Sequence, residues 1–277
     1  MFTRIINRSL RDLVAMLRGQ VLAIILVFCC HLALQAQKAQ RPGLLISKNG
    51  RFFTDEKGKP FFWLGDTGWL LFARLNREEA AYYLEDRRQK GFNVIQVMLL
   101  HELTVANCYG EAALEGGNLL KPRVTAGSYP GKPGEYDYWD HVEYIVDLAA
   151  TKGIYLALVP VWGTAVKQGK VSPEQAESYA RFLAKRFQKN WNIIWLNGGD
   201  IRGSDSPEVW NRIGETLRRQ DRSHLISFHP FGRTSSGEWF HQAAWLDFNL
   251  FQSGHRNYAQ DTAASDHRFG EDNYRYV

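Results

Sequence analysis

The stretch Trp191–Asp200, which reads W-N-I-I-W-L-N-G-G-D, decides the fold class. Its apolar run, Ile193 to Leu196, is branched and aromatic and is followed by turn-forming residues, a pattern typical of a fully buried parallel strand. Asn197, two glycines and Asp200 follow the run. In a barrel of alternating strands and helices, the carboxyl ends of the strands build the active site. The stretch therefore predicts a parallel α/β fold that carries a carboxylate, Asp200, at a strand end.

Short apolar runs that end in polar or aromatic residues recur along the chain. They predict five further strands, at Phe61–Leu64, Phe92–Leu100, Ile154–Val159, Leu225–Phe228 and Leu246–Phe251. A small hairpin is expected around Asn49-Gly50, because this pair favours a tight turn. The long glycine-rich segment 101–133 has no clear period, and on a barrel we expect it over the mouth, since loops of this length are usually functional or disordered.

Helices are predicted between these strands from their start and stop signals. Asn76 caps one that runs to Lys90, and Ser172-Pro173-Glu174-Gln175 has the cap, first-turn proline and capping-box glutamine of another. Two more are expected at Tyr136–Lys152 and Pro207–Gln220. This regular alternation favours a TIM-type (β/α)8 barrel. The alternative is a doubly wound open sheet, weakened by the absence of a nucleotide-binding glycine motif.

Six strands are fewer than a closed barrel needs. We therefore expect residues 44–277 to be the N-terminal part of a barrel domain, truncated after about six βα units. A polar linker, residues 37–43, precedes this domain.

The formal net charge of +5 is concentrated at the N-terminus. Residues 1–36 contribute +3 of it and hold the apolar run Val21–Leu34, so they match a secretory signal peptide. The remaining chain is nearly balanced, which argues against nucleic-acid binding. The protein is expected to be secreted or periplasmic, without stable membrane insertion once the signal is removed; an uncleaved N-terminal anchor is the alternative.

Residues at successive strand ends form the candidate site. They are Asp66, Trp69, Gln96, Trp162, Asn197, Asp200, His229, Gln252 and His255. Carboxylates, amides and aromatic rings, without cysteines or histidines at metal-ligand spacing, favour sugar recognition with acid/base chemistry. We therefore predict a carbohydrate substrate and neither a metal nor a cofactor, with Asp200 as the proton donor and the other eight residues as substrate ligands.

Several of these residues also have simpler interpretations. Asp200 and Asp66 both stand among glycines, where an aspartate serves equally well as a turn or cap residue. Gln96 interrupts an apolar run, so its side chain either points into the barrel interior towards a ligand or pairs with a neighbouring backbone group. His229 and His255 could ligate a metal, although substrate hydrogen bonding is the better interpretation.

Three motifs in order carry a family resemblance. Phe62–Trp69 (F-W-L-G-D-T-G-W), Gly91–Gln96 (G-F-N-V-I-Q) and Trp195–Asp200 (W-L-N-G-G-D) together resemble the apiosidase-like glycoside hydrolases. These are barrel enzymes, many of them from bacteria that degrade plant pectin, and they often carry a C-terminal domain assigned to collagen binding. The similarity runs from about Leu44 to the last residue.

The resemblance implies a retaining mechanism on plant cell-wall, pectin-type glycans. It places the acid/base at the end of the fourth strand, which Asp200 matches, and a glutamate nucleophile at the end of the seventh. That glutamate has no counterpart here, because Glu271 falls in the helix after strand six. We therefore expect this chain alone to expose an open barrel edge and to be inactive or nearly so. The alternative is a non-catalytic carbohydrate-binding or surface adhesion protein on the same barrel.

Overall fold

The structure, a computed structural model, describes residues 43–132 and 134–253. Residues 1–36, His255 and Glu271 lie outside the described residues, so the predictions made for them remain predictions. Five parallel strands dominate the described part of the chain. They are β4 (Gly65–Thr67), β5 (Val94–Met98), β6 (Tyr155–Val159), β7 (Ile193–Ile201) and β8 (Ile226–Pro230).

The strand order in this sheet is the order of the sequence, β4-β5-β6-β7-β8. A doubly wound sheet reverses its order at a switch point, whereas a barrel adds each strand beside the one before it. The observed order therefore favours the barrel over the open sheet.

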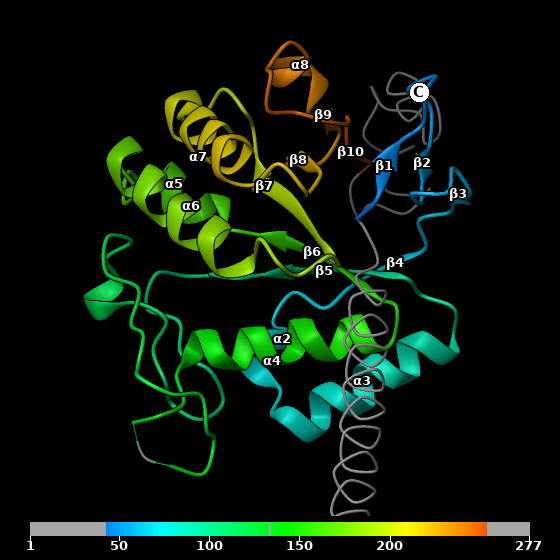
Figure 1. The fold of residues 1–277 in the computed structure, drawn as a ribbon. Helices are drawn as coiled ribbons and strands as arrows, with labels where there is room; N and C mark the ends of the chain where they lie inside the picture. The colour runs from blue at the N-terminus through cyan, green and yellow to red at the C-terminus, as the bar shows by residue number, and fades with distance from the viewer. Residues whose placement is uncertain (1–42, 133, 254–277) are drawn as a thin grey trace, which may run out of the picture. The chain divides into compact units, whose positions relative to one another are not determined.

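Helices cover one face of the sheet. The long ones are α3 (Arg77–Gln89), α4 (Tyr138–Thr151), α6 (Pro173–Phe187) and α7 (Pro207–Gln220), and shorter ones are α2 (Leu71–Arg74), α5 (Gly163–Lys167) and α8 (Gly237–Phe240). In Figure 1, α6 and α7 lie side by side, and α3 lies beside α4. Their apolar sides pack with strand residues such as Ile95, Leu158 and Trp195 into one buried core.

The other face of the sheet carries a second, smaller core. Val94, Ala157, Ile194 and Leu196 form its centre. Aromatic residues pack against it, among them Trp63, Trp69, Trp162 and Phe248. Because strand residues alternate between faces, the inner and outer positions of each strand follow directly from these two cores.

The predicted helix caps Asn76 and Ser172 are confirmed, whereas the helix predicted from Tyr136 begins at Tyr138. The Asn76 side chain accepts hydrogen bonds from the backbone N–H groups of Glu78 and Glu79, and the Glu79 carboxylate accepts one from the Asn76 N–H. Ser172 and Gln175 form the same reciprocal box at α6. Within residues 101–132 the regular structure is limited to the short 3-10 helix η1 (Glu115–Gly117) and two isolated β-bridges, which fits the loop predicted there.

Two predicted strands are wrong. Phe61–Leu64 is not the first buried strand, because Phe62 is 79% exposed and the parallel strand β4 begins only at Gly65. Pro60–Phe61 is instead β3 of a small antiparallel sheet with β2 (Phe53–Thr54) and β1 (Leu45–Ile46), which contains the predicted hairpin.

Leu246–Phe251 is the second wrong strand. The Asp247 N–H donates to the Ile226 carbonyl over 2.8 Å, so the segment starts beside β8 without forming a ladder with it. Only β10 (Phe251–Gln252) is a strand, and it pairs antiparallel with β9 (Thr234–Ser235). Among the described residues, no helix combines the length and the apolar character that crossing a membrane requires.

Candidate active site

An aromatic cluster stands at the carboxyl ends of the strands. The ring centroids of Trp69 and Trp162 lie 5.5 Å apart, and the His229 ring lies 5.5 Å from Trp69 and 5.9 Å from Trp162. The three residues come from the segments after β4 and β6 and from β8 itself. The structure thus brings together three of the predicted site residues from distant parts of the sequence.

Asp200 lies beside this cluster. Its carboxylate Oδ1 is 3.9 Å from His229 Nδ1, and its side chain is 41% exposed, whereas that of His229 is 7% exposed. The exposed carboxylate next to half-buried aromatic rings can exchange a proton with a bound molecule. Acid/base chemistry on a bound sugar needs a carboxylate in an accessible position of this kind.

A bulge in β7 sets the place of Asp200. Gly198 pairs with His229 and Ile201 pairs with Pro230, so Gly199 and Asp200 are extra residues in the ladder. Asp200 has a φ of 47°, in the left-handed region, and Gly199 has a φ of 118°. Bulges of this kind re-aim side chains next to active sites. Only glycine adopts the Gly199 conformation without strain, and aspartate tolerates the left-handed one better than most residues.

Asp66 does not face the cluster. It lies in register with Ile95, whose side chain belongs to the helix-side core. The Asp66 Oδ2 contacts Arg87 Nε at 2.5 Å and accepts a hydrogen bond from the Tyr83 hydroxyl at 3.0 Å, both on α3. The prediction that Asp66 binds substrate is therefore not supported, because its carboxylate joins the sheet to a helix.

Asn197 is also directed towards the helices. Its side chain is fully buried, its Nδ2 donates to the Trp210 carbonyl in α7 at 2.7 Å, and its Oδ1 accepts from the Gly198 N–H at 3.1 Å. A side chain with this burial and these partners cannot reach a sugar hydroxyl. The structure places Asn197 as an anchor of the bulge instead of the predicted substrate ligand.

Gln96 and Gln252 occupy different settings. Gln96 is half-buried and in register with Ala157, which belongs to the inner core, so it faces the barrel interior, one of the two alternatives left open by the sequence. Gln252 lies in β10, which pairs antiparallel with β9 and also contacts β8 of the parallel sheet. His255 lies outside the described residues.

Sequence reasoning missed the packing role of two glycines. A Cβ on Gly199 would stand 2.6 Å from Trp162 Cε3, and a Cβ on Gly163 would stand 2.7 Å from Ile201 Cβ. The bulge, Trp162 and the start of α5 therefore fit together only with glycine at these positions. In the sequence, the adjacent pair Gly198-Gly199 was the one signal that could have indicated such close packing.

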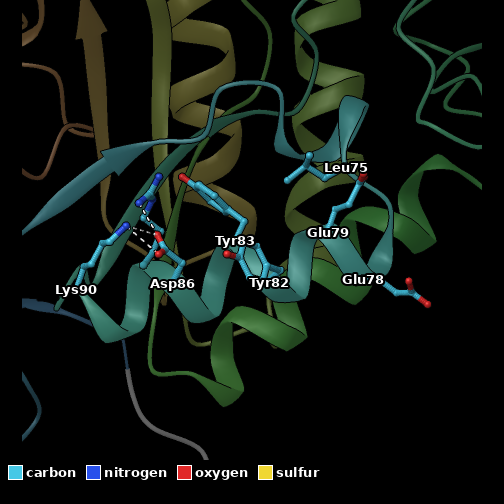
Figure 2. Close-up of a pocket in the computed structure, with 8 residues that line it drawn as sticks. Leu75, Glu78, Glu79, Tyr82, Tyr83, Asp86 and Lys90 are labelled. Carbon is cyan, nitrogen blue, oxygen red and sulfur yellow. Dashed lines mark hydrogen bonds and ion pairs between the residues drawn. The ribbon is translucent and has the colours of Figure 1, made fainter.

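Two surface hollows lie elsewhere. One, of about 570 Å³, runs along α3 and is lined by Leu75, Tyr82, Tyr83 and charged residues, including the Asp86–Lys90 pair drawn in Figure 2. The other, of about 840 Å³, lies between β1–β3 and the segment 247–251. Neither is lined by a residue of the aromatic cluster or by Asp200. Within residues 43–132 and 134–253, no group of three or more histidine, cysteine or carboxylate side chains is placed to hold a metal.

The sequential parallel sheet is the arrangement of a (β/α)8 barrel, and solved structures with this fold match the chain. A glycoside hydrolase family 5 protein from Bacteroides vulgatus matches with a TM-score of 0.76 and 43% identity over 87% of this chain and 50% of its own. A second glycoside hydrolase matches with a TM-score of 0.76 and 44% identity over 85% of this chain and 52% of its own.

A more distant glycoside hydrolase from Bacteroides vulgatus, 17% identical, shares the fold with a TM-score of 0.56 over 76% of this chain and 42% of its own. The family model of the apiosidase-like catalytic domain matches residues 47–277.

The chain belongs to this apiosidase-like family. Its fold is that of the (β/α)8 barrel, of which the described residues supply five parallel strands. The chain spans about half the length of the first two matched structures. A comparison with curated proteins finds no match.

Proposed function

We propose that the protein hydrolyses glycosidic bonds in plant cell-wall glycans of the pectin type, with retention of configuration and with Asp200 as the general acid/base. The observation that carries this proposal is the position of Asp200. It stands on a left-handed bulge at the end of the fourth parallel strand, with an exposed carboxylate beside the Trp69–Trp162–His229 cluster. The pectin-type substrate rests on the family resemblance alone.

Each part of the site has a role in this reaction. The carboxylic acid of Asp200 protonates the glycosidic oxygen while a second carboxylate attacks the anomeric carbon and displaces the leaving group. The Asp200 carboxylate then takes a proton from the water that displaces the second carboxylate from that carbon. The Trp69 and Trp162 rings offer flat apolar faces on which a sugar ring can stack. Retaining hydrolysis requires a second carboxylate about 5 Å from the first. We propose that it comes from outside the described residues.

We further propose that residues 1–36 direct the protein out of the cytoplasm. A plant polysaccharide would be encountered only outside that compartment. The apolar run Val21–Leu34 behind an arginine-bearing segment supports this assignment.

A screen of the full-length protein on pectic oligosaccharides tests the proposed reaction. The expected result is release of a sugar that initially has the same anomeric configuration as the substrate. The anomeric proton signal, followed by NMR during turnover, reports this configuration before mutarotation changes it. The Asp200→Asn variant should release the sugar about 10³-fold more slowly. Binding of the oligosaccharides without any turnover by the wild-type protein would contradict hydrolysis and favour the carbohydrate-binding alternative.

A further inference from the structure

The bulge in β7 changes the partner of one backbone N–H group. Residues 198 and 201 of β7 pair with the consecutive residues 229 and 230 of β8, so the amide of Asp200 loses its place in the ladder. A backbone N–H that loses its strand partner next to a core needs another acceptor. Among the described residues, that acceptor is the side chain of His229, whose Nδ1 lies 3.3 Å from the Asp200 nitrogen.

The His229 ring is held firmly enough to act as a fixed acceptor. Its side chain is 7% exposed, and it packs edge-on against Trp69 and at a tilt against Trp162. Because Nδ1 accepts a hydrogen bond, it carries a lone pair, and the proton of the neutral ring sits on Nε2. The two nitrogens are therefore distinct. Nδ1 accepts the hydrogen bond from the bulge, and Nε2 carries the ring proton.

We propose that His229 is a positioning residue for Asp200, acting through Nδ1 on the backbone and not as a ligand of the sugar. This inference rests on the proposed role of Asp200 as the acid/base. The hydrogen bond holds the peptide that precedes the Asp200 Cα, and so it selects the left-handed turn that points the carboxylate at the site. A displacement of about 1 Å in a reacting group can lower a rate about 10²-fold.

Two substitutions by amide side chains distinguish the contribution of Nδ1 from that of Nε2. His229→Asn places its amide near the position of Nδ1, and His229→Gln places its amide near the position of Nε2. On an alkyl glycoside that the full-length wild-type protein hydrolyses, whose poor leaving group needs the proton donor, we expect His229→Asn to keep kcat within about tenfold. We expect His229→Gln to lose about 10²-fold in kcat with little change in KM. The opposite ranking, or a loss that lies mainly in KM, would overturn the proposal and make His229 a substrate ligand.

Hydrogen exchange tests the same contact without turnover. In amide NMR spectra, the Asp200 N–H should exchange at least about tenfold faster in His229→Gln than in wild type, and His229→Asn should retain most of the protection. The matched control is His141→Gln. His141 is also buried, but it bridges the Tyr136 hydroxyl and the Leu75 carbonyl, so its loss should leave Asp200 exchange unchanged.

The two readouts keep this proposal distinct from the proposed function. Equal Asp200 exchange in wild type and in His229→Gln would overturn the positioning role, even if Asp200→Asn abolishes hydrolysis. The predicted exchange pattern in a protein that hydrolyses no glycoside would support the Nδ1 contact and contradict the acid/base role of Asp200.

Discussion

The indole ring of Trp162 lies directly on the backbone of Gly199. A Cβ at Gly199 would stand 2.6 Å from Trp162 Cε3, closer than real side chains approach. The same tryptophan packs against Trp69 and against the ring of His229. The aromatic surface of the site and the turn that presents Asp200 are therefore one packed unit, and a change in either should disturb the other.

Gly199→Ala tests this contact. The new methyl group must displace the Trp162 ring, and alanine is strained at a φ of 118°. We expect a loss of about 2–4 kcal/mol in the free energy of unfolding, measured by urea denaturation. Gly58→Ala is the matched control, because its φ is 77° with nothing within 4 Å of the added atom. It should cost only about 1 kcal/mol. Similar losses in both variants would show that the Trp162 contact contributes little.

Asn197→Ala should affect stability and not substrate binding. The substitution removes two hydrogen bonds in a buried setting, one to the Trp210 carbonyl and one from the Gly198 N–H. We expect a loss of about 2–3 kcal/mol in the free energy of unfolding, with KM of the folded enzyme unchanged. A large rise in KM without a loss of stability would restore the predicted role of Asn197 as a sugar ligand.

Asp66→Ala should weaken the junction between β4 and α3. Its carboxylate accepts from Tyr83 and pairs with Arg87, on a side chain that is 28% exposed. We expect a loss of about 1 kcal/mol in the free energy of unfolding. Asp86→Ala, which removes ion pairs with Lys90 and Arg87 but leaves the Asp66 carboxylate in place, should cost less. Loss of sugar binding by Asp66→Ala, at unchanged stability, would contradict this structural role.

A buried pair at the opposite ends of the strands makes stability depend on pH. Burial alone would raise the pKa of Asp221, but its hydrogen bond with His224 at 2.5 Å, the charge of His224 and the bond from Trp195 Nε1 hold that pKa below its ordinary value. Because the pKa is lower in the folded protein, the stabilisation is complete above the unfolded value of about 4 and is lost as the pH falls below it.

Unfolding measurements at several pH values check this dependence. Wild type should exceed Asp221→Asn in stability at about pH 6, and the difference should shrink towards about pH 3. If the difference stays constant over this range, the Asp221 carboxylate does not gain its stabilisation from the His224 pair.

Local signals predicted the helices and the central strand well. The caps at Asn76 and Ser172 and the apolar run Ile193–Leu196 act within a few residues, so the sequence pattern alone locates them. The prediction of a buried strand at Phe61–Leu64 was wrong, because an apolar run does not determine which residues pair with an adjacent strand. β4 contains Gly65, Asp66 and Thr67, and only its pairing with β5 makes it a strand.

The direction of side chains could not be predicted for the same reason. The strand-end position of Asp66 and Asn197 suggested a shared site, yet both face the helices because of their register with Ile95 and Phe228. A one-residue change of register reverses the face of a side chain. Trp69, Trp162 and His229 do lie together, since each follows or ends a different parallel strand, and their role as substrate ligands stays a prediction.

The most direct measurement compares leaving groups in the full-length Asp200→Asn variant, since asparagine keeps the left-handed turn but cannot donate the proton. A general acid matters most for a poor leaving group. We expect kcat/KM to fall about 10³-fold on alkyl glycosides and less than about tenfold on 2,4-dinitrophenyl glycosides, whose leaving group departs without protonation, at an unchanged melting temperature. Equal losses on both substrates, or a large drop in melting temperature, would contradict the role of Asp200 as proton donor.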